Sequence, residues 1–302
     1  MNARKSRAEA AAAKVAAMRA EQARAERRRK LLAWGGVAVV LVLVAALVVA
    51  KLAGVGTAKA AKTTAASDAL TSTLASASPG LESLGAGTAS NPPTAIKATT
   101  LTSGGKPRIM YVGAEYCPFC AAQRWAVAVA LSRFGTWSGL GQTTSAAGDV
   151  YPNTPTLSFH GAKLTSSYVT FTGAETTTNQ PLAGGSGYQA LDTLSASDTA
   201  LVKKYNAAPY VAASSAGSIP FIDIGGAYIS SGASYTPQLL SGMTQAQVAA
   251  ALKVPTNPIA QAVGGAANVL TAAICKTTNN QPAAVCTASG VTAAATKLGH
   301  AS

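Results

Sequence analysis

Two cysteines separated by two residues, Cys117 and Cys120, are the feature of this sequence that most directly indicates chemistry. A Cys-x-x-Cys pair can cycle between a dithiol and a disulfide, and it can therefore exchange electrons with other thiols. Cys275 and Cys286 bring the total to four cysteines, an even number that suits two pairs in an oxidising compartment. The residue types and their spacing therefore point first to thiol chemistry.

The residues around the first pair predict a strand followed by a helix. Residues 108–112 have the composition of a short buried strand, and residues 121–134 have apolar side chains at helical spacing. Cys117 then lies at the N-terminus of a helix, where unpaired backbone N–H groups and the helix dipole favour a thiolate. We expect Cys117 to be the nucleophile and Cys120, one turn further on, to resolve the mixed disulfide. Pro118 suits the first turn because its missing N–H costs no hydrogen bond there.

A second element follows about a hundred residues downstream. Residues 217–228 predict a strand, a glycine turn and a second strand, with Pro220 at the start of the first strand, where a strand tolerates proline. The paired segments would be Phe221–Ile224 and Ala227–Ser230.

The order of strand, Cys-x-x-Cys, helix, and then Ile-Pro, strand, Gly-Gly and strand resembles the thioredoxin superfamily. The resemblance implies an α/β, thioredoxin-like domain over residues 96–255, with Cys117 and Cys120 as catalytic residues. It also implies a cis-proline at Ile219–Pro220 that faces the cysteines and helps to bind substrate.

The sequence departs from the family pattern in two places near the cysteines. Many thioredoxins have a buried acidic residue six positions before the first cysteine, where this chain has Tyr111. Proton transfer to and from Cys120 then needs another group, and Glu115 is the nearby candidate. The dipeptide between the cysteines, Pro118-Phe119, is nearer to those of glutaredoxins and DsbA-type oxidants than to that of reducing thioredoxins. This favours an oxidant or isomerase.

Residues 151–218 exceed what a minimal member of that family needs, and they are expected to form an insertion. Within it, Thr156–Phe159 and Tyr168–Thr172 predict an added hairpin, and Ala196–Asn206 predicts a helix. Such an insertion would either shape a substrate surface or only enlarge the fold.

A predicted transmembrane helix precedes the domain. Residues 31–50 form an apolar run of 20 residues between Lys30 and Lys51, long enough to cross the hydrocarbon core of a bilayer. The basic block directly before the run predicts a cytoplasmic N-terminus and an extracytoplasmic C-terminal domain. A cleaved signal peptide is the competing interpretation, but the charged N-terminal region and the apolar run are both long for one.

Charge and aromatic content differ along the chain. Of the net charge of +13, residues 1–30 contribute +7, from ten Lys and Arg against three Asp and Glu, so a nucleic-acid surface on the remainder is disfavoured. Residues 1–30 predict a basic cytoplasmic helix near anionic lipid. Of 17 aromatic residues, 16 lie between Tyr111 and Tyr235, which places the core there. Residues 51–95, rich in Ala, Ser, Thr and Gly, predict a linker with a short helix near residues 68–74.

The second cysteine pair lies in residues 256–302, expected to form a C-terminal helix and a disulfide loop packed on the domain. A structural disulfide between Cys275 and Cys286 is the favoured interpretation. Two alternatives stay open: a second redox pair that exchanges with the first, and, less favoured because short cysteine spacings are not repeated, a zinc site of four cysteines.

The sequence as a whole predicts a membrane-anchored extracytoplasmic thiol-disulfide oxidoreductase with no cofactor and no metal. Its partners would be protein thiol or disulfide substrates, the lipid bilayer, and a membrane redox partner, either an oxidase or a thiol carrier. Nucleic acid is not an expected partner. The alternative is a catalytically inactive thioredoxin-like binding or structural module with two structural disulfides.

Overall fold

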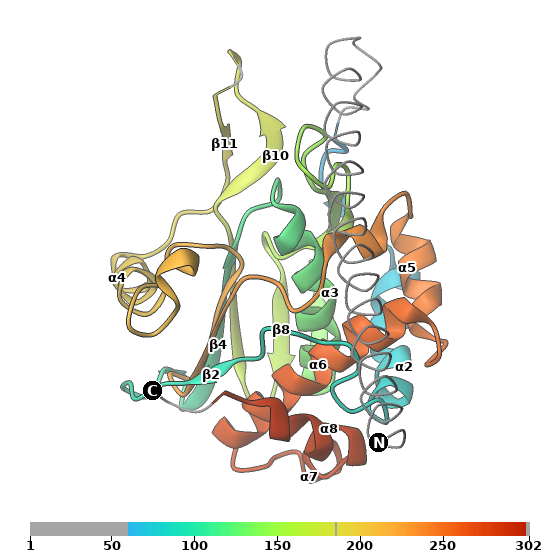
Figure 1. Ribbon diagram of the computed structural model, residues 1–302, viewed down its shortest axis with the longest axis vertical. Helices are drawn as coiled ribbons and strands as arrows, with labels where there is room; N and C mark the ends of the chain where they lie inside the picture. The colour runs from blue at the N-terminus through green and yellow to red at the C-terminus, as the bar shows by residue number, and fades with distance from the viewer. Residues whose placement is uncertain (1–59, 185, 300–302) are drawn as a thin grey trace, which may run out of the picture. The chain divides into compact units, whose positions relative to one another are not determined.

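The central strand of the domain is β4 (Lys106–Gly113), whose second half is buried. In a computed structural model, which describes residues 60–184 and 186–299, β4 pairs in parallel with β9 (Thr170–Glu175). On its other side β4 pairs in antiparallel with β12 (Phe221–Ile224). The sheet continues through β13 (Tyr228–Ser231) to the short edge strand β2 (Thr94–Ala95). These strands form a mixed sheet at the centre of an α/β domain (Figure 1).

Both faces of this sheet are covered, which is consistent with the unbroken apolar run at residues 109–112 in the second half of β4. Successive side chains of a strand point to opposite faces. Ile109 and Tyr111 belong to the larger core cluster, which also contains residues of α3 (Pro118–Ser132) and α6 (Pro258–Thr277). Met110 and Val112 belong to a second cluster, on which α4 (Ala196–Tyr205) packs. The domain therefore has helices on both sides of the central sheet.

The remaining elements surround this core. Further helices are α2 (Asp68–Leu81), α5 (Gln245–Leu252), α7 (Ala283–Cys286) and α8 (Ser289–Ala294), with 3-10 turns at Ala213–Ser215, Pro237–Leu240 and Ala295–Lys297. Further strands are β1 (Thr64–Ala65), β3 (Thr102–Ser103), β5 (Gly135–Ser138), β6 (Gly141–Thr144), β7 (Pro155–Ser158), β8 (Lys163–Ser166), β10 (Thr177–Pro181) and β11 (Tyr188–Ala190). The hairpin of β10 and β11 lies at the same end of the domain as the start of α3, whereas α7 and α8 lie at the opposite end (Figure 1).

The prediction of an inserted hairpin is wrong. β7, at residues 155–158, pairs with β6, and the other half of the expected hairpin is part of β9. β9 is a central strand and α4 covers one face of the sheet, so residues 151–218 contain core elements and are not an insertion. The predicted helix at 196–206 is confirmed as α4.

The prediction that residues 51–95 form a linker is also wrong from Ala60 onward. α2 is twice as long as expected at 14 residues, and its side chains Leu70, Leu74 and Leu81 are buried in the larger core cluster. Their spacing places these leucines on one face of a helix. The chain is therefore part of the domain well before residue 96.

The predicted transmembrane helix and the basic helix before it, residues 1–50, lie outside the described residues. Within the described part of the chain, α6 alone is long and apolar enough to cross a membrane. Most of α6 is buried, and it packs against α3 in the core. Asn257 caps its start by accepting a hydrogen bond from the N–H of Ile259.

Candidate functional site

Cys117 is the N-cap of α3, directly after the loop that leaves β4. Its sulfur accepts a hydrogen bond from the backbone N–H of Cys120 at 3.2 Å, and Pro118 occupies the first helical position. Cys117 is 6% exposed and Cys120 is completely buried. The two cysteines are not bonded to each other, so the structure shows the dithiol form.

The surroundings of the two thiols shift their pKa values in opposite directions. The pKa of Cys117 is lowered, first by its hydrogen bond with the Cys120 side chain and further by backbone N–H groups of Cys120 and Phe119 and the charge of Arg124. Burial raises the pKa of Cys120 well above its usual value, and the neighbouring Cys117 adds to this. Such an arrangement suits a nucleophile at Cys117 and a protonated partner at Cys120.

Ile219 and Pro220 meet the cysteines from the opposite strand. β12 pairs with β4 so that Phe221 lies opposite Val112, and this register brings the residues before β12 to the end of β4. The carbonyl oxygen of Ile219 lies 3.9 Å from the sulfur of Cys117. The Ile219–Pro220 peptide bond is cis, as predicted. The two predicted substrate-binding residues therefore lie beside the nucleophile.

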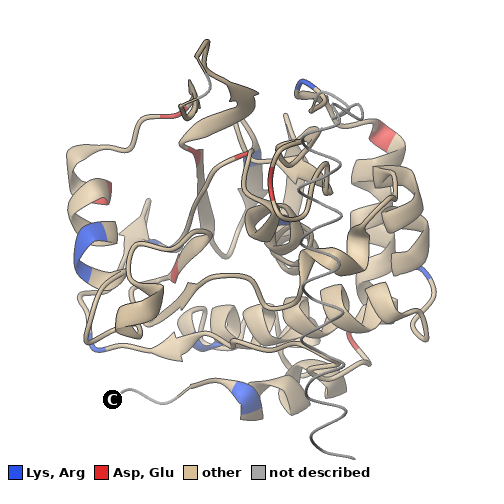
Figure 2. Cartoon of the chain, turned by 45° about the horizontal axis from the view of Figure 1, so that its top comes forward, with Lys and Arg blue, Asp and Glu red and all other residues tan. Residues whose placement is uncertain are grey.

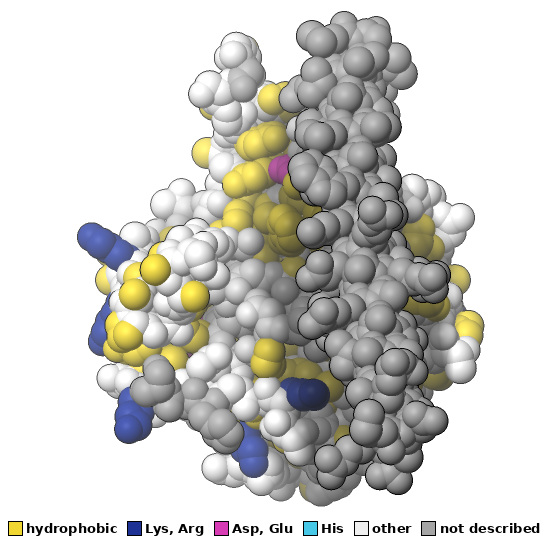
Figure 3. Space-filling view, in the orientation of Figure 1, with side chains coloured by type: hydrophobic (Ala, Val, Ile, Leu, Met, Phe, Trp, Pro, Cys, Tyr) yellow, Lys and Arg dark blue, Asp and Glu magenta, His cyan; other side chains and the backbone are white. Residues whose placement is uncertain are grey.

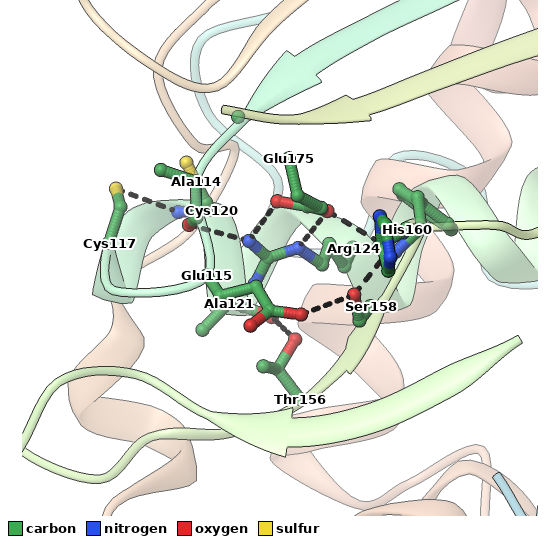
Figure 4. Close-up of polar contacts among 12 residues, drawn as sticks. Ala114, Glu115, Cys117, Cys120, Ala121, Arg124, Thr156, Ser158, His160 and Glu175 are labelled. Atoms are coloured by element: carbon green, nitrogen blue, oxygen red, sulfur yellow. Dashed lines mark hydrogen bonds and ion pairs between the residues drawn. The ribbon is translucent and has the colours of Figure 1, made fainter. Parts of the chain in front are cut away.

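A buried ion pair that the sequence analysis did not identify lies next to the thiols. Arg124 of α3 donates two hydrogen bonds to Glu175 at the end of β9, at 2.8 and 2.6 Å, and both side chains are fully buried. Arg124 also donates to the carbonyl oxygen of Ala114, at 2.6 Å, in the loop before Cys117 (Figure 4). The available signal was one charged residue in an apolar helix, four positions after Cys120.

Glu115, the predicted proton-transfer residue, is buried and directed at Ser158. The Ser158 hydroxyl donates to its carboxylate at 2.6 Å, and Figure 4 shows that carboxylate turned toward β7. The pKa of Cys120 responds instead to Glu175, whose charge raises it after the larger effects of burial and of Cys117. A role for Glu115 in proton transfer stays a prediction.

Aromatic residues flank Cys117 in the chain and contact neighbouring elements. The rings of Tyr116 and Tyr188 stack with their centres 4.3 Å apart, which connects the cysteine loop to the β10–β11 hairpin. Phe119, between the two cysteines, is 40% exposed and contacts the ring of Tyr151. Hydrophobic side chains gather beneath the hairpin in Figure 3. Phe119 therefore presents an exposed apolar ring two residues from the nucleophile.

Cys275 and Cys286 form a disulfide, as predicted, at the other end of the domain. A Cβ atom at Gly225 would lie 3.0 Å from Thr277 and 3.6 Å from Pro107, so the end of α6 lies beside the start of β4. Six residues of strand, about 20 Å, separate Pro107 from the loop before Cys117. Direct exchange between the two pairs is not compatible with this arrangement.

The disulfide also makes Cys275 and Cys286 unable to share a four-cysteine zinc site with the first pair. Among the described residues, no group of three or more His, Cys, Asp or Glu side chains could hold a metal ion. His160, near the site, instead lies with its ring Nδ1 2.7 Å from Asp192, which accepts a hydrogen bond from the N–H of Glu175.

Comparison with known families identifies the family of this chain. A family model described as a domain of unknown function, DUF929, matches residues 92–276. The chain belongs to the DUF929 family. The matched segment contains both Cys117 and Cys120, the ion pair of Arg124 with Glu175, and Pro220.

A second family model, described as an inhibitor of host cell division protein domain, matches residues 9–65, most of which lie outside the described residues. No curated protein and no solved structure matches the chain. The DUF929 match therefore supplies a family without a function, and any assignment of function has to come from the site itself.

Proposed function

We propose that the protein is a membrane-anchored extracytoplasmic thiol-disulfide oxidoreductase with a thioredoxin-like fold, acting on protein thiols through Cys117 and Cys120. The strand order β9-β4-β12-β13, with the cysteines at the junction of β4 and α3, supports the fold. The membrane anchor rests on the apolar residues 31–50. The disulfide between Cys275 and Cys286 supports an oxidising compartment.

The observation that carries the proposal is the position of Cys117. Its sulfur caps a helix, accepts the N–H of Cys120 and lies beside a second, unbonded thiol. A helix N-terminus stabilises negative charge, so the nucleophilic thiolate forms more readily at Cys117 than at an isolated cysteine. A purely structural pair would need no such separation of the two thiols.

The proposed reaction is a two-step exchange of electrons. In the reducing direction, the Cys117 thiolate attacks one sulfur of a substrate disulfide, the substrate S–S bond breaks, and one substrate thiolate leaves. Cys120 then loses its proton and attacks the Cys117 sulfur, which releases the second substrate thiolate and leaves a Cys117–Cys120 disulfide. The substrate gains the two electrons that the cysteine pair loses. The oxidising direction is the same sequence reversed.

Turnover in either direction needs a second exchange partner, which we propose to be a membrane oxidase or thiol carrier that restores the cysteine pair. Substrate would approach over the apolar surface around Phe119, which is exposed beside Cys117. Polypeptide segments with apolar residues near a cysteine or disulfide suit such a surface, because burying apolar area stabilises the complex. No cofactor or metal takes part in the proposed chemistry.

Trapping of mixed disulfides tests this function. The Cys120→Ser variant of the full-length protein, mixed with an unfolded disulfide-containing protein, should form a covalent complex through Cys117 that reductant dissolves. The matched Cys117→Ser variant, which keeps Cys120, should form none, because Cys120 is buried and its pKa is raised. Absence of a complex with Cys120→Ser would leave a thioredoxin-like binding module without redox activity.

A further inference from the structure

The Arg124–Glu175 ion pair is a polar feature at the centre of a domain in which charged residues are few and scattered (Figure 2). Only 12% of the chain is Asp, Glu, Lys or Arg. A buried ion pair rarely adds stability, because apolar residues of similar volume usually serve the fold as well or better. Stability alone therefore does not explain why these two charges lie in the core.

The position of Arg124 relates it to both cysteines. It follows Cys120 by four residues on α3, so both side chains lie on the same face of the helix, one turn apart. Its bond to the carbonyl oxygen of Ala114 fixes the loop that leads to Cys117. Glu175 holds the guanidinium through two of its nitrogens, so this charge cannot turn away.

Part of the guanidinium remains available. The Nη1 atom of Arg124 is buried and has no hydrogen-bond partner within the described residues, and the same holds for the hydroxyl of Tyr111. The charge of Arg124 lowers the pKa of Cys117, after the larger contribution of hydrogen bonding from Cys120. It also opposes the rise that burial causes in the pKa of Cys120. Arg124 itself stays charged: burial lowers its pKa, but the charge and hydrogen bonding of Glu175, together with the neighbouring Tyr111 and Cys120, more than offset this.

We infer that Arg124 is a positioning residue whose fixed charge, held by Glu175, favours the thiolate form at Cys117 and assists ionisation of Cys120 when it resolves a mixed disulfide. A charge that stabilises a thiolate stabilises the reduced form of the pair, and this makes the pair a stronger oxidant. The inference rests on the proposed function for its consequence, but the effect on the thiols can be measured without any substrate.

The test measures the rate of iodoacetamide alkylation of Cys117 against pH in the full-length protein, read by mass spectrometry. Arg124→Met should slow alkylation at pH 7 about three- to tenfold, since an opposite charge nearby favours the charged form of a group. Glu175→Gln should accelerate it, because it leaves the charge of Arg124 uncompensated. A purely structural role would not move the two variants in opposite directions.

A matched control is available on the same helix. Arg133 is also buried, and it donates to Ser78 and Thr271 at the far end of α3, about 20 Å along the helix from Cys120. Arg133→Met should leave the alkylation profile of Cys117 unchanged. Arg124→Lys, which keeps the charge, should alkylate closer to the wild-type rate than Arg124→Met does.

The double variant Arg124→Met with Glu175→Gln covers the risk that a single variant does not fold, because it leaves no unpaired charge in the core. Its alkylation rate should lie between those of the single variants.

The equilibrium with glutathione should shift toward the protein disulfide by about three- to tenfold in Arg124→Met. Folded variants with the wild-type alkylation profile would overturn the inference. A wild-type pair that does not exchange with glutathione would instead refute the proposed function.

Discussion

The two cysteine pairs occupy opposite ends of the domain and opposite ends of their helices. Cys117 caps the start of α3, whereas Cys275 lies in the last turn of α6. The positive end of a helix dipole favours a thiolate, and the negative end disfavours it. The pair at the helix start is unbonded, and the pair at the helix end is a disulfide that closes the loop into α7. The same residue type is thus suited to chemistry in one place and to cross-linking in the other.

The largest expected effect is on activity, which should depend on the Cys117–Cys120 pair and not on the Cys275–Cys286 pair. Cys117→Ser should lower the rate of catalysed thiol-disulfide exchange on the order of a thousandfold, because it removes the nucleophile. The paired change Cys275→Ser with Cys286→Ser should retain most of the rate. The measurement is the rate of disulfide reduction in a model peptide at pH 7. A similar loss in both variants would mean that the second pair takes part in the reaction.

The second effect is on stability, which should depend on the Cys275–Cys286 disulfide much more than on Cys117. Removal of the Cys275–Cys286 disulfide should lower the free energy of unfolding by about 2–4 kcal/mol, because the unfolded chain gains the freedom of the opened loop. Urea denaturation of the full-length protein gives this value. Cys117→Ser should change the stability of the reduced protein much less. An unchanged midpoint without the disulfide would contradict a structural role for it.

A third effect concerns the strand that runs between the two pairs. Asp223 of β12 is buried, which raises its pKa to about 6, although it accepts a hydrogen bond from the N–H of Gly226. A folded-state pKa above the unfolded value favours the protonated form, so stability should fall as pH rises from about 4 to about 6, by about 2–3 kcal/mol.

Asp223→Asn should remove this pH dependence, because an amide does not ionise in this pH range. The amide oxygen can still accept the hydrogen bond from Gly226. Urea denaturation at several pH values between 4 and 7 measures it in both proteins. Parallel stability curves for wild type and Asp223→Asn would show that Asp223 ionises normally in the folded protein.

The smallest effect concerns Tyr111, which lies on β4 six residues before Cys117. Its hydroxyl is buried without a hydrogen-bond partner in the described part of the chain. Tyr111→Phe removes an unsatisfied polar group and should therefore raise the free energy of unfolding by about 1 kcal/mol. A destabilised variant would mean that the hydroxyl has a partner, and the thiol of Cys120 would be the first to examine.

Local patterns were sufficient to predict the elements that carry the cysteines. The strand before Cys117, the helix after it and the pair of strands after Pro220 all lie within one or a few residues of their predicted bounds. Each depends on short-range signals: apolar periodicity, a proline at a permitted position, or a capping residue.

Long-range pairing could not be predicted in the same way. β9 pairs with β4 from about sixty residues away, and nothing in its own sequence distinguishes a central strand from an added hairpin. Glu175 was missed for that reason, since its place beside Arg124 depends on this pairing. The predicted helix at residues 68–74 is shorter than α2, because small polar residues outnumber the leucines in this segment. Leu70, Leu74 and Leu81 nevertheless share a helical face.

The reduction potentials of the two pairs, measured in one sample, distinguish a redox-active pair from a structural one. The full-length protein is equilibrated in glutathione buffers of graded potential, quenched with acid, alkylated and mapped by mass spectrometry. We expect Cys117–Cys120 to be half reduced between about −270 and −120 mV, while Cys275–Cys286 stays oxidised to below about −300 mV. If both pairs titrate together, or if Cys117–Cys120 never exchanges while the protein stays folded, the division between a redox-active and a structural pair is wrong.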